Sequence, residues 1–290
     1  VAKEFGLDVI KVEAEWGTPL DPKRFQAILE EDVEKEIKAV ILTHSETSTG
    51  VINDLKTISS YIRDHKKALS IIDCVTSIGA CNVPVDEWEL DIVASGSQKG
   101  YMIPPGLSFV SMSNKAWQAS EDSNLPKFYL NLKSYKKSLS SNSNPYTPAV
   151  NLIFALDESL RMMKDEGLET IFKRHKRHKL AVSQAAKNLN LKLFANEKNL
   201  SPAVTAIQIE DIDAEKFRKI IKNKYDILLA GGQDHLKGKI FRVGHLGYIN
   251  DRDIISAIAA IGNTLIELNK ISTKQVGEAL KVASNHLEET

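Results

Sequence analysis

The sequence predicts an α/β fold with a mainly parallel, doubly wound sheet, because short apolar runs alternate with helical patterns in its first half. Ala39–Thr43 is a continuous apolar run typical of a strand that is buried on both faces. A helical pattern over 53–66 separates it from the next strand pattern, at 69–73. Helical crossovers make successive strands parallel, and ligands then bind beyond their carboxyl ends.

Further elements extend this pattern on both sides. We expect strands at 7–12, 92–95 and 107–110, with the first residues forming the end of a helix that leads into the first strand. Asp21 and Pro22 predict a helix that continues to Lys35, because Asp caps a helix and Pro suits its first turn. The Ser-, Asn- and Pro-rich stretch 138–148 predicts a loop, followed by a long helix over 150–164.

The pattern changes after Gly167. A long helix to about residue 188 is followed by strand patterns near 191, 204 and 240 and by helices near 214 and 251. We therefore predict two domains: a large domain over 1–165, and a smaller C-terminal α+β domain over 166–290.

The composition indicates a globular protein with no charge bias. Lys plus Arg and Asp plus Glu both number 38, which favours neither a nucleic-acid nor a membrane partner. The two cysteines form no disulfide framework, so we expect reduced thiols and a cytoplasmic location. The basic run 172–179 is interpreted as a solvated helix face, and its His175 and His178 lack the partners of a metal site, so no metal is predicted.

Lys99 is the most informative single residue. It follows the predicted strand 92–95 within Ser95–Gly96–Ser97–Gln98–Lys99–Gly100, where small residues let a flat molecule approach the backbone. Partial desolvation there is expected to lower the pKa of the amine and make it a nucleophile. Asp73 ends the preceding apolar strand, and a lysine and an aspartate on neighbouring strand ends are what pyridoxal 5′-phosphate (PLP) requires. The alternative for Lys99 is a solvated loop lysine.

Five segments occur in order along the chain, although each alone is a weak signal. They are 44–50, 95–100 with Asp73 and Val75 before it, 104–106, 146–149 and 241–247. Together they resemble the class V (fold type I) PLP-dependent aminotransferases, in particular the alanine–glyoxylate and serine–glyoxylate branch. The resemblance covers essentially the whole chain. It implies a PLP-transferase large domain, a homodimer, and transfer of the amino group of a small amino acid, alanine or serine, to a 2-oxo acid such as glyoxylate.

The resemblance also implies roles for the residues nearest to the cofactor ring. Lys99 would be the covalent anchor and the general acid and base, and Asp73 would hold the ring nitrogen protonated. Thr47 would lie against one face of the ring and Val75 against the other. The alternatives are a turn or capping threonine at position 47 and an ordinary core valine at position 75.

Four other residues would bind the phosphate or the substrate. The resemblance implies that Ser97 and Gln98 contact the phosphate or the phenolic oxygen, and that Thr147 reaches the phosphate of the neighbouring subunit. Arg242 would bind the substrate α-carboxylate, because a guanidinium pairs with a carboxylate through two hydrogen bonds. A structural salt bridge is the alternative for Arg242. His44 and His245 are interpreted as packed or exposed loop residues.

Members of this family normally begin with an arm and a Gly/Ser-rich phosphate loop. We expect the N-terminal portion of the large domain to be absent before Val1, so that the chain as written forms an incomplete fold. Two other functions remain open at this point. One is a different fold type I PLP enzyme, either a lyase or a cysteine desulfurase, and the other is a non-catalytic fragment.

Overall fold

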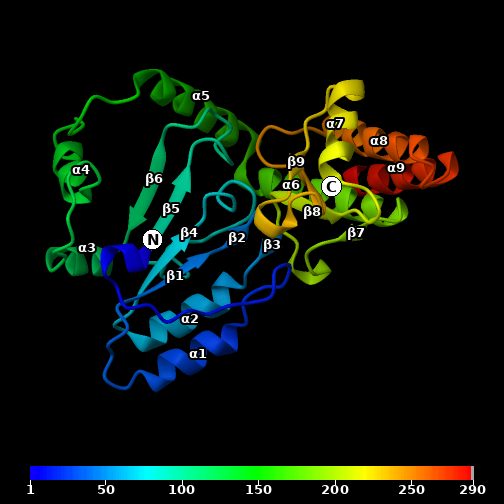
Figure 1. Ribbon diagram of the computed structural model, residues 1–290. Coiled ribbons are helices and arrows are strands. Elements are labelled where there is room, and N and C mark those ends of the chain that lie inside the picture. The colour runs from blue at the N-terminus through cyan, green and yellow to red at the C-terminus, as the bar shows by residue number, and fades with distance from the viewer. Residues whose placement is uncertain (289–290) are drawn as a thin grey trace.

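The computed structural model describes residues 1–288 and contains two four-stranded sheets (Figure 1). The larger sheet has the order β1-β4-β5-β6. Its strands are β1 (Ala39–Thr43), β4 (Leu69–Asp73), β5 (Ile92–Gly96) and β6 (Ser108–Met112). β1, β4 and β5 are parallel, and only the edge strand β6 runs antiparallel to its neighbour β5. The predicted α/β fold with a mainly parallel sheet is therefore confirmed.

The register of the larger sheet brings the predicted site strands together. Asp73, the last residue of β4, pairs with Thr43 of β1 and with Ala94 of β5. The carboxyl ends of the three parallel strands therefore lie at one edge of the sheet. The segments that carry Thr47, Asp73 and Lys99 all leave the sheet at this edge.

Two helices, α1 (Pro22–Glu31) and α2 (Leu55–His65), lie side by side on one face of this sheet (Figure 1). The side chains of Asp21 and Asp54 accept backbone hydrogen bonds at the starts of these helices and so cap them. The apolar faces of both helices meet the inward side chains of the strands. The best-buried members of this core include Leu55, Ile58, Ile62 and Ile72.

The smaller sheet has the order β7-β8-β10-β9 and is antiparallel. Its strands are β7 (Lys192–Leu193), β8 (Val204–Gln208), β9 (Ala230–Gly231) and β10 (Ile240–Gly244). It packs with α6 (Leu168–Asn188), α7 (Ala214–Tyr225), α8 (Asp251–Glu267) and α9 (Thr273–Glu288). This second core agrees with the expected α+β pattern. The boundary at 165/166 stays a prediction, and residues 289 and 290 lie outside the described residues.

Further helices and turns lie between and beside these strands. α3 (Asn114–Glu121), α4 (Leu132–Leu139) and α5 (Val150–Glu166) follow β6, and short 3₁₀ helices lie at Ala2–Phe5, Glu197–Asn199 and Asp234–Leu236. The hairpin of β2 (Ser45–Glu46) and β3 (Val51–Ile52) contacts the segment before β8, through a bridge from Val51 to Leu200. Among residues 1–288, no helix has both the length and the apolar character that a membrane crossing requires.

Two predicted elements were wrong in detail. Residues 7–12, all within the described part of the chain, form no strand, because no neighbouring strand pairs with them and most of them are exposed. The first helix ends at Glu31 rather than at Lys35. Lys35 has a positive φ of 57°, a backbone conformation that is incompatible with an α-helix.

Candidate active site

The turn that carries Lys99 is held by its own backbone and by its neighbours. The Met102 amide donates to the carbonyl of Lys99 at 2.9 Å, which closes the turn. The hydroxyl of Ser159, on α5, donates to the carbonyl of Tyr101. Gly247, which follows β10, packs on the other side, with its β-carbon position 3.4 Å from the Lys99 carbonyl oxygen. Lys99 is thus a half-buried residue on a turn held by several backbone contacts.

The residue after Lys99 packs directly against the turn that follows β4. A β-carbon at Gly100 would lie 2.1 Å from the carbonyl oxygen of Ile78 and 3.0 Å from the Cα of Gly79. Real atoms do not approach so closely, so position 100 requires glycine. This contact fixes the Lys99 turn relative to the segment that carries Asp73 and Val75.

The Asp73 carboxylate is oriented by the turn that follows it. The Oδ1 atom of Asp73 accepts a hydrogen bond from the Val75 amide at 2.9 Å, which orients the carboxylate. A β-carbon at Gly96 would lie 3.1 Å from Oε1 of Gln98 and 3.8 Å from Cγ1 of Val75. Gly96 therefore lies close to both of these side chains, and a side chain at position 96 would crowd Gln98. Asp73 is exposed in this structure.

Ser97 is placed differently from the sequence interpretation. It is fully buried, and its hydroxyl donates to the Pro104 carbonyl at 2.8 Å and accepts from the Leu107 amide at 3.1 Å. Its own amide donates to the Leu107 carbonyl. Both donors of Ser97 are used inside the loop, so this residue supports the loop instead of facing a ligand. Gln98, by contrast, is exposed.

Arg242 and Thr47 come from different sheets and meet. Arg242, on β10, donates from Nη1 to the Thr47 carbonyl at 2.7 Å and from Nε to the Gly231 carbonyl at 2.8 Å. The loop that contains Thr47 is the tip of the β2–β3 hairpin, which the hydroxyl contact between Ser45 and Ser201 holds to the smaller sheet at 2.8 Å. The guanidinium is therefore fixed by backbone carbonyls rather than by a salt bridge, and burial lowers its pKa.

Three other singled-out residues have clear environments. Thr147 is exposed in the segment before α5, so its contact with a partner subunit stays a prediction. His44 and His245 are both buried, which agrees with the packed alternative. Burial lowers the pKa of His44 to about 4 and that of His245 to about 3, and His245 contacts Thr205 at 2.9 Å and the Pro202 carbonyl at 3.0 Å.

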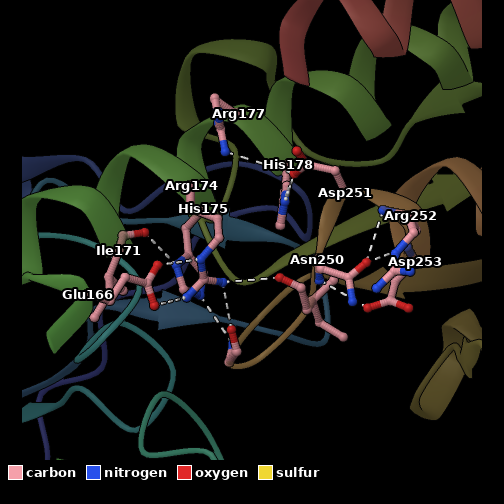
Figure 2. A network of polar contacts seen from close by, with 12 residues as sticks. Glu166, Ile171, Arg174, His175, Arg177, His178, Asn250, Asp251, Arg252 and Asp253 are labelled. Carbon is pink, nitrogen blue, oxygen red and sulfur yellow. Dashed lines mark hydrogen bonds and ion pairs between the residues drawn. The ribbon is translucent and has the colours of Figure 1, made fainter. Parts of the chain in front are cut away.

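The interpretation of the basic run as a solvated face was wrong for its histidines. Lys173 and Lys176 are exposed, whereas His175 and His178 are fully buried on the other side of α6. Figure 2 shows the polar network that they enter with neighbouring residues of α6 and α8. The signal for this burial is present in the sequence, because Ile171, His175, His178 and Val182 recur at helical spacing.

A cavity of about 680 Å³ lies at the opposite, amino-terminal end of the parallel strands. Its lining includes Ser70, Asp91, Ser113 and Lys115. The Asp91 carboxylate accepts from the Ser70 amide at 3.0 Å and from the Ser113 hydroxyl at 2.7 Å, and Lys115 lies 3.5 Å away. These polar groups connect the starts of β4 and β5 to the end of β6, so this cavity is separate from the candidate active site.

The fold, with its mainly parallel sheet, matches the PLP-transferase fold of solved aminotransferase structures. The family model of the class-V aminotransferases matches residues 1–245. The chain belongs to the class-V aminotransferase family.

Relatives agree with this family and differ in their names. The chain is 57% identical over 288 residues to a protein of Anabaena cylindrica named soluble hydrogenase 42 kDa subunit, covering 98% of this chain and 75% of the relative. It is 37% identical over 293 residues to the L-aspartate–glyoxylate aminotransferase of Paracoccus denitrificans (strain Pd 1222), covering 100% and 74%. The crystal structure of ureidoglycine–glyoxylate aminotransferase from Bacillus subtilis superposes with a TM-score of 0.91 at 32% identity, covering 99% of this chain and 74% of that chain.

Proposed function

We propose that this protein is a PLP-dependent aminotransferase that moves the amino group of a small amino acid, alanine or serine, to glyoxylate. Glyoxylate occurs as a substrate in the names of the Paracoccus and Bacillus relatives, which supports the choice of acceptor. We also propose that it acts as a homodimer in the cytoplasm, with Thr147 completing the site of the partner subunit.

The observation that carries the proposal is the contact between Arg242 and the Thr47 carbonyl at 2.7 Å. It brings a guanidinium from the smaller sheet to the edge of the larger sheet where β1, β4 and β5 end. Asp73 and Lys99 leave the sheet at that edge. A carboxylate binder, an amine and a carboxylate at one edge are the groups that amino transfer needs.

Each residue then has a chemical task. The cofactor supplies an electron-withdrawing ring that stabilises the negative charge left when the substrate Cα loses its proton. Lys99 would hold the cofactor covalently and, when its amine is free, would take that proton. The Asp73 carboxylate would accept a hydrogen bond from the protonated ring nitrogen. Arg242 binds the substrate carboxylate and so orients the Cα–H bond.

The residues around the ring complete the site. Thr47 and Val75 are proposed to lie against its two faces, and the exposed Gln98 is proposed to contact the phosphate or the phenolic oxygen. Ser97 supports this arrangement through the hydrogen bonds of its hydroxyl with the Pro104 carbonyl and the Leu107 amide.

The two cysteines argue against the desulfurase alternative. That reaction needs a thiolate on an accessible loop. Burial raises the pKa of Cys74 to about 11 and that of Cys81 to about 12, so both are protonated thiols at neutral pH.

The test is to identify the lysine that binds PLP and the reaction that follows. The full-length protein is incubated with PLP, reduced with borohydride, digested and mapped by mass spectrometry. We expect the label on Lys99, its loss in Lys99→Ala, and its retention in Lys67→Ala, a control at an exposed lysine. A label at another residue, or none in the wild-type protein, refutes the proposal.

Substrate class is tested on the same preparation. L-Alanine or L-serine should abolish the visible absorbance of the bound cofactor, and glyoxylate should restore it, while L-aspartate serves as the competing donor. Release of ammonia or of sulfide would indicate a lyase or a desulfurase instead. Hydrogen uptake is measured in parallel, because the Anabaena relative carries a hydrogenase name.

A further inference from the structure

Arg174 and His175, consecutive residues of α6, hydrogen-bond to the carbonyl and the amide of Gly247, in the loop after β10. The amide of Gly247 donates to Nε2 of His175 at 3.1 Å, and the carbonyl of Gly247 accepts from Nη1 of Arg174 at 2.8 Å. Nη1 of Arg174 also reaches the carbonyl of Ile249 at 3.2 Å. Figure 2 shows both side chains directed at this loop. The loop is therefore fixed by three hydrogen bonds from a single helix turn.

Both side chains are themselves fixed. Arg174 forms two hydrogen bonds with the Glu166 carboxylate, at 2.7 and 3.0 Å. Nδ1 of His175 lies 2.8 Å from the Ile171 carbonyl, to which it can only donate. Nε2 is then the acceptor for Gly247, which requires the neutral ring. Burial lowers the pKa of His175 to about 4, so the ring is neutral under physiological conditions.

Gly247 itself lies next to the Lys99 turn. Its backbone has a positive φ of 88°, and its β-carbon position lies 3.4 Å from the Lys99 carbonyl oxygen and 3.5 Å from Cγ of Met102. The same Lys99 carbonyl accepts the Met102 amide. A side-chain carbon at position 247 would touch this turn, so the backbone of Gly247 runs directly beside it.

We propose that Arg174 and His175 are positioning residues for Lys99, acting through Gly247. The inference rests on the proposed function, because it assumes that Lys99 holds the cofactor. It assigns a role in the reaction to a basic helix segment whose sequence suggested only a solvated face.

His178 provides the matched control. It lies on the same helix three residues further on, is also fully buried, and bonds Asp251 at 2.8 Å instead of Gly247. His175→Leu and His178→Leu should both lose stability. Only the former removes the acceptor for the Gly247 amide, whereas His175→Gln keeps an acceptor oxygen within reach.

The first readout needs no cofactor. Amide hydrogen exchange of the peptide that contains Met102 is followed in the cofactor-free protein, at a temperature where all variants are folded. We expect exchange about tenfold faster in His175→Leu than in wild type, little change in His178→Leu, and partial restoration in His175→Gln. Equal exchange in the two leucine variants would overturn the inference.

The second readout separates positioning from substrate binding. A displaced amine lowers kcat by about 10- to 100-fold with little change in KM, since substrate binding by Arg242 is untouched. If wild-type protein lacks PLP on Lys99, the proposed function fails. If wild type carries it and His175→Leu turns over like His178→Leu, only the present inference fails.

Discussion

Replacing Gly100 with alanine tests whether the Lys99 turn must sit against the turn after β4. The new β-carbon would lie 2.1 Å from the carbonyl oxygen of Ile78. Ordinary carbon–oxygen contacts are about 3.3 Å or longer, so one turn has to move by roughly 1 Å. The φ angle of Gly100 is not positive, so the backbone conformation itself allows alanine and the effect comes from this contact alone.

A displacement of this size should affect the reaction more than the fold. Forcing one methyl group into a packed contact costs about 1–3 kcal/mol of the free energy of unfolding. Misplacing a reacting group by roughly 1 Å can lower turnover by about 100-fold. We therefore expect Gly100→Ala to fold, to unfold at a lower temperature, and to lose most of its turnover.

The assay compares thermal unfolding, covalent PLP incorporation at Lys99 and kcat in one set of proteins. Gly277→Ala is the control, because a β-carbon there has no heavy atom within 4 Å and alanine favours the helix α9. That variant should be about 0.5–1 kcal/mol more stable and fully active. Unchanged turnover in Gly100→Ala would refute the reasoning.

Three further predictions concern the substrate, the ring nitrogen and pH. Arg242→Ala should raise the KM for the amino acid by roughly 10- to 150-fold, because hydrogen bonds to a charged group contribute about 1.5–3 kcal/mol. Arg242→Lys should recover little of the lost affinity, since it loses the hydrogen bonds to the Thr47 and Gly231 carbonyls. Steady-state measurement of KM in both variants checks this. Asp73→Asn should lower kcat while PLP still labels Lys99, and an unchanged kcat would contradict its role. The pKa values of His175 and His245 are about 4 and about 3 in the folded protein, below the ordinary 6.5. The unfolded chain therefore binds more protons below pH 6.5, so stability falls with decreasing pH, by about 2 kcal/mol for each histidine at pH 5. Urea unfolding at pH 7 and at pH 5 measures this loss. Equal free energies of unfolding at the two pH values would show that both histidines are protonated in the folded protein.

The strands of the larger sheet were predictable because their signals are local. Ala39–Thr43 and Leu69–Asp73 are apolar runs separated by a helical pattern, and both appear as strands with those bounds. The segment 7–12 carries a similar local pattern and forms no strand. Strand formation also needs a partner strand, and pairing is a long-range property that a short pattern does not contain.

The sequence identifies candidate site residues, but it does not predict how buried they are or which groups they hydrogen-bond. Asp73 and Val75 lie on one segment, where the Val75 amide donates to Oδ1 of Asp73, and their places around a ring stay predictions. The burial of Ser97 depends on the carbonyl of Pro104 and the amide of Leu107, which the chain brings back only after its next turn. His175 was misjudged because charged neighbours concealed its place on the apolar side of α6.

The segment formed by β10 and the loop after it lies next to two different parts of the candidate site. The side chain of Arg242, in β10, is held to the tip of the β2–β3 hairpin, and Gly247, five residues later, lies beside the Lys99 turn. One short segment therefore lies next to both the loop after β1 and the turn after β5. If Arg242 binds the substrate carboxylate and Lys99 takes the Cα proton, the distance between these two functions is set by this stretch. Arg174 and His175 are then as important for the geometry of the reaction as the strands that carry the reacting groups.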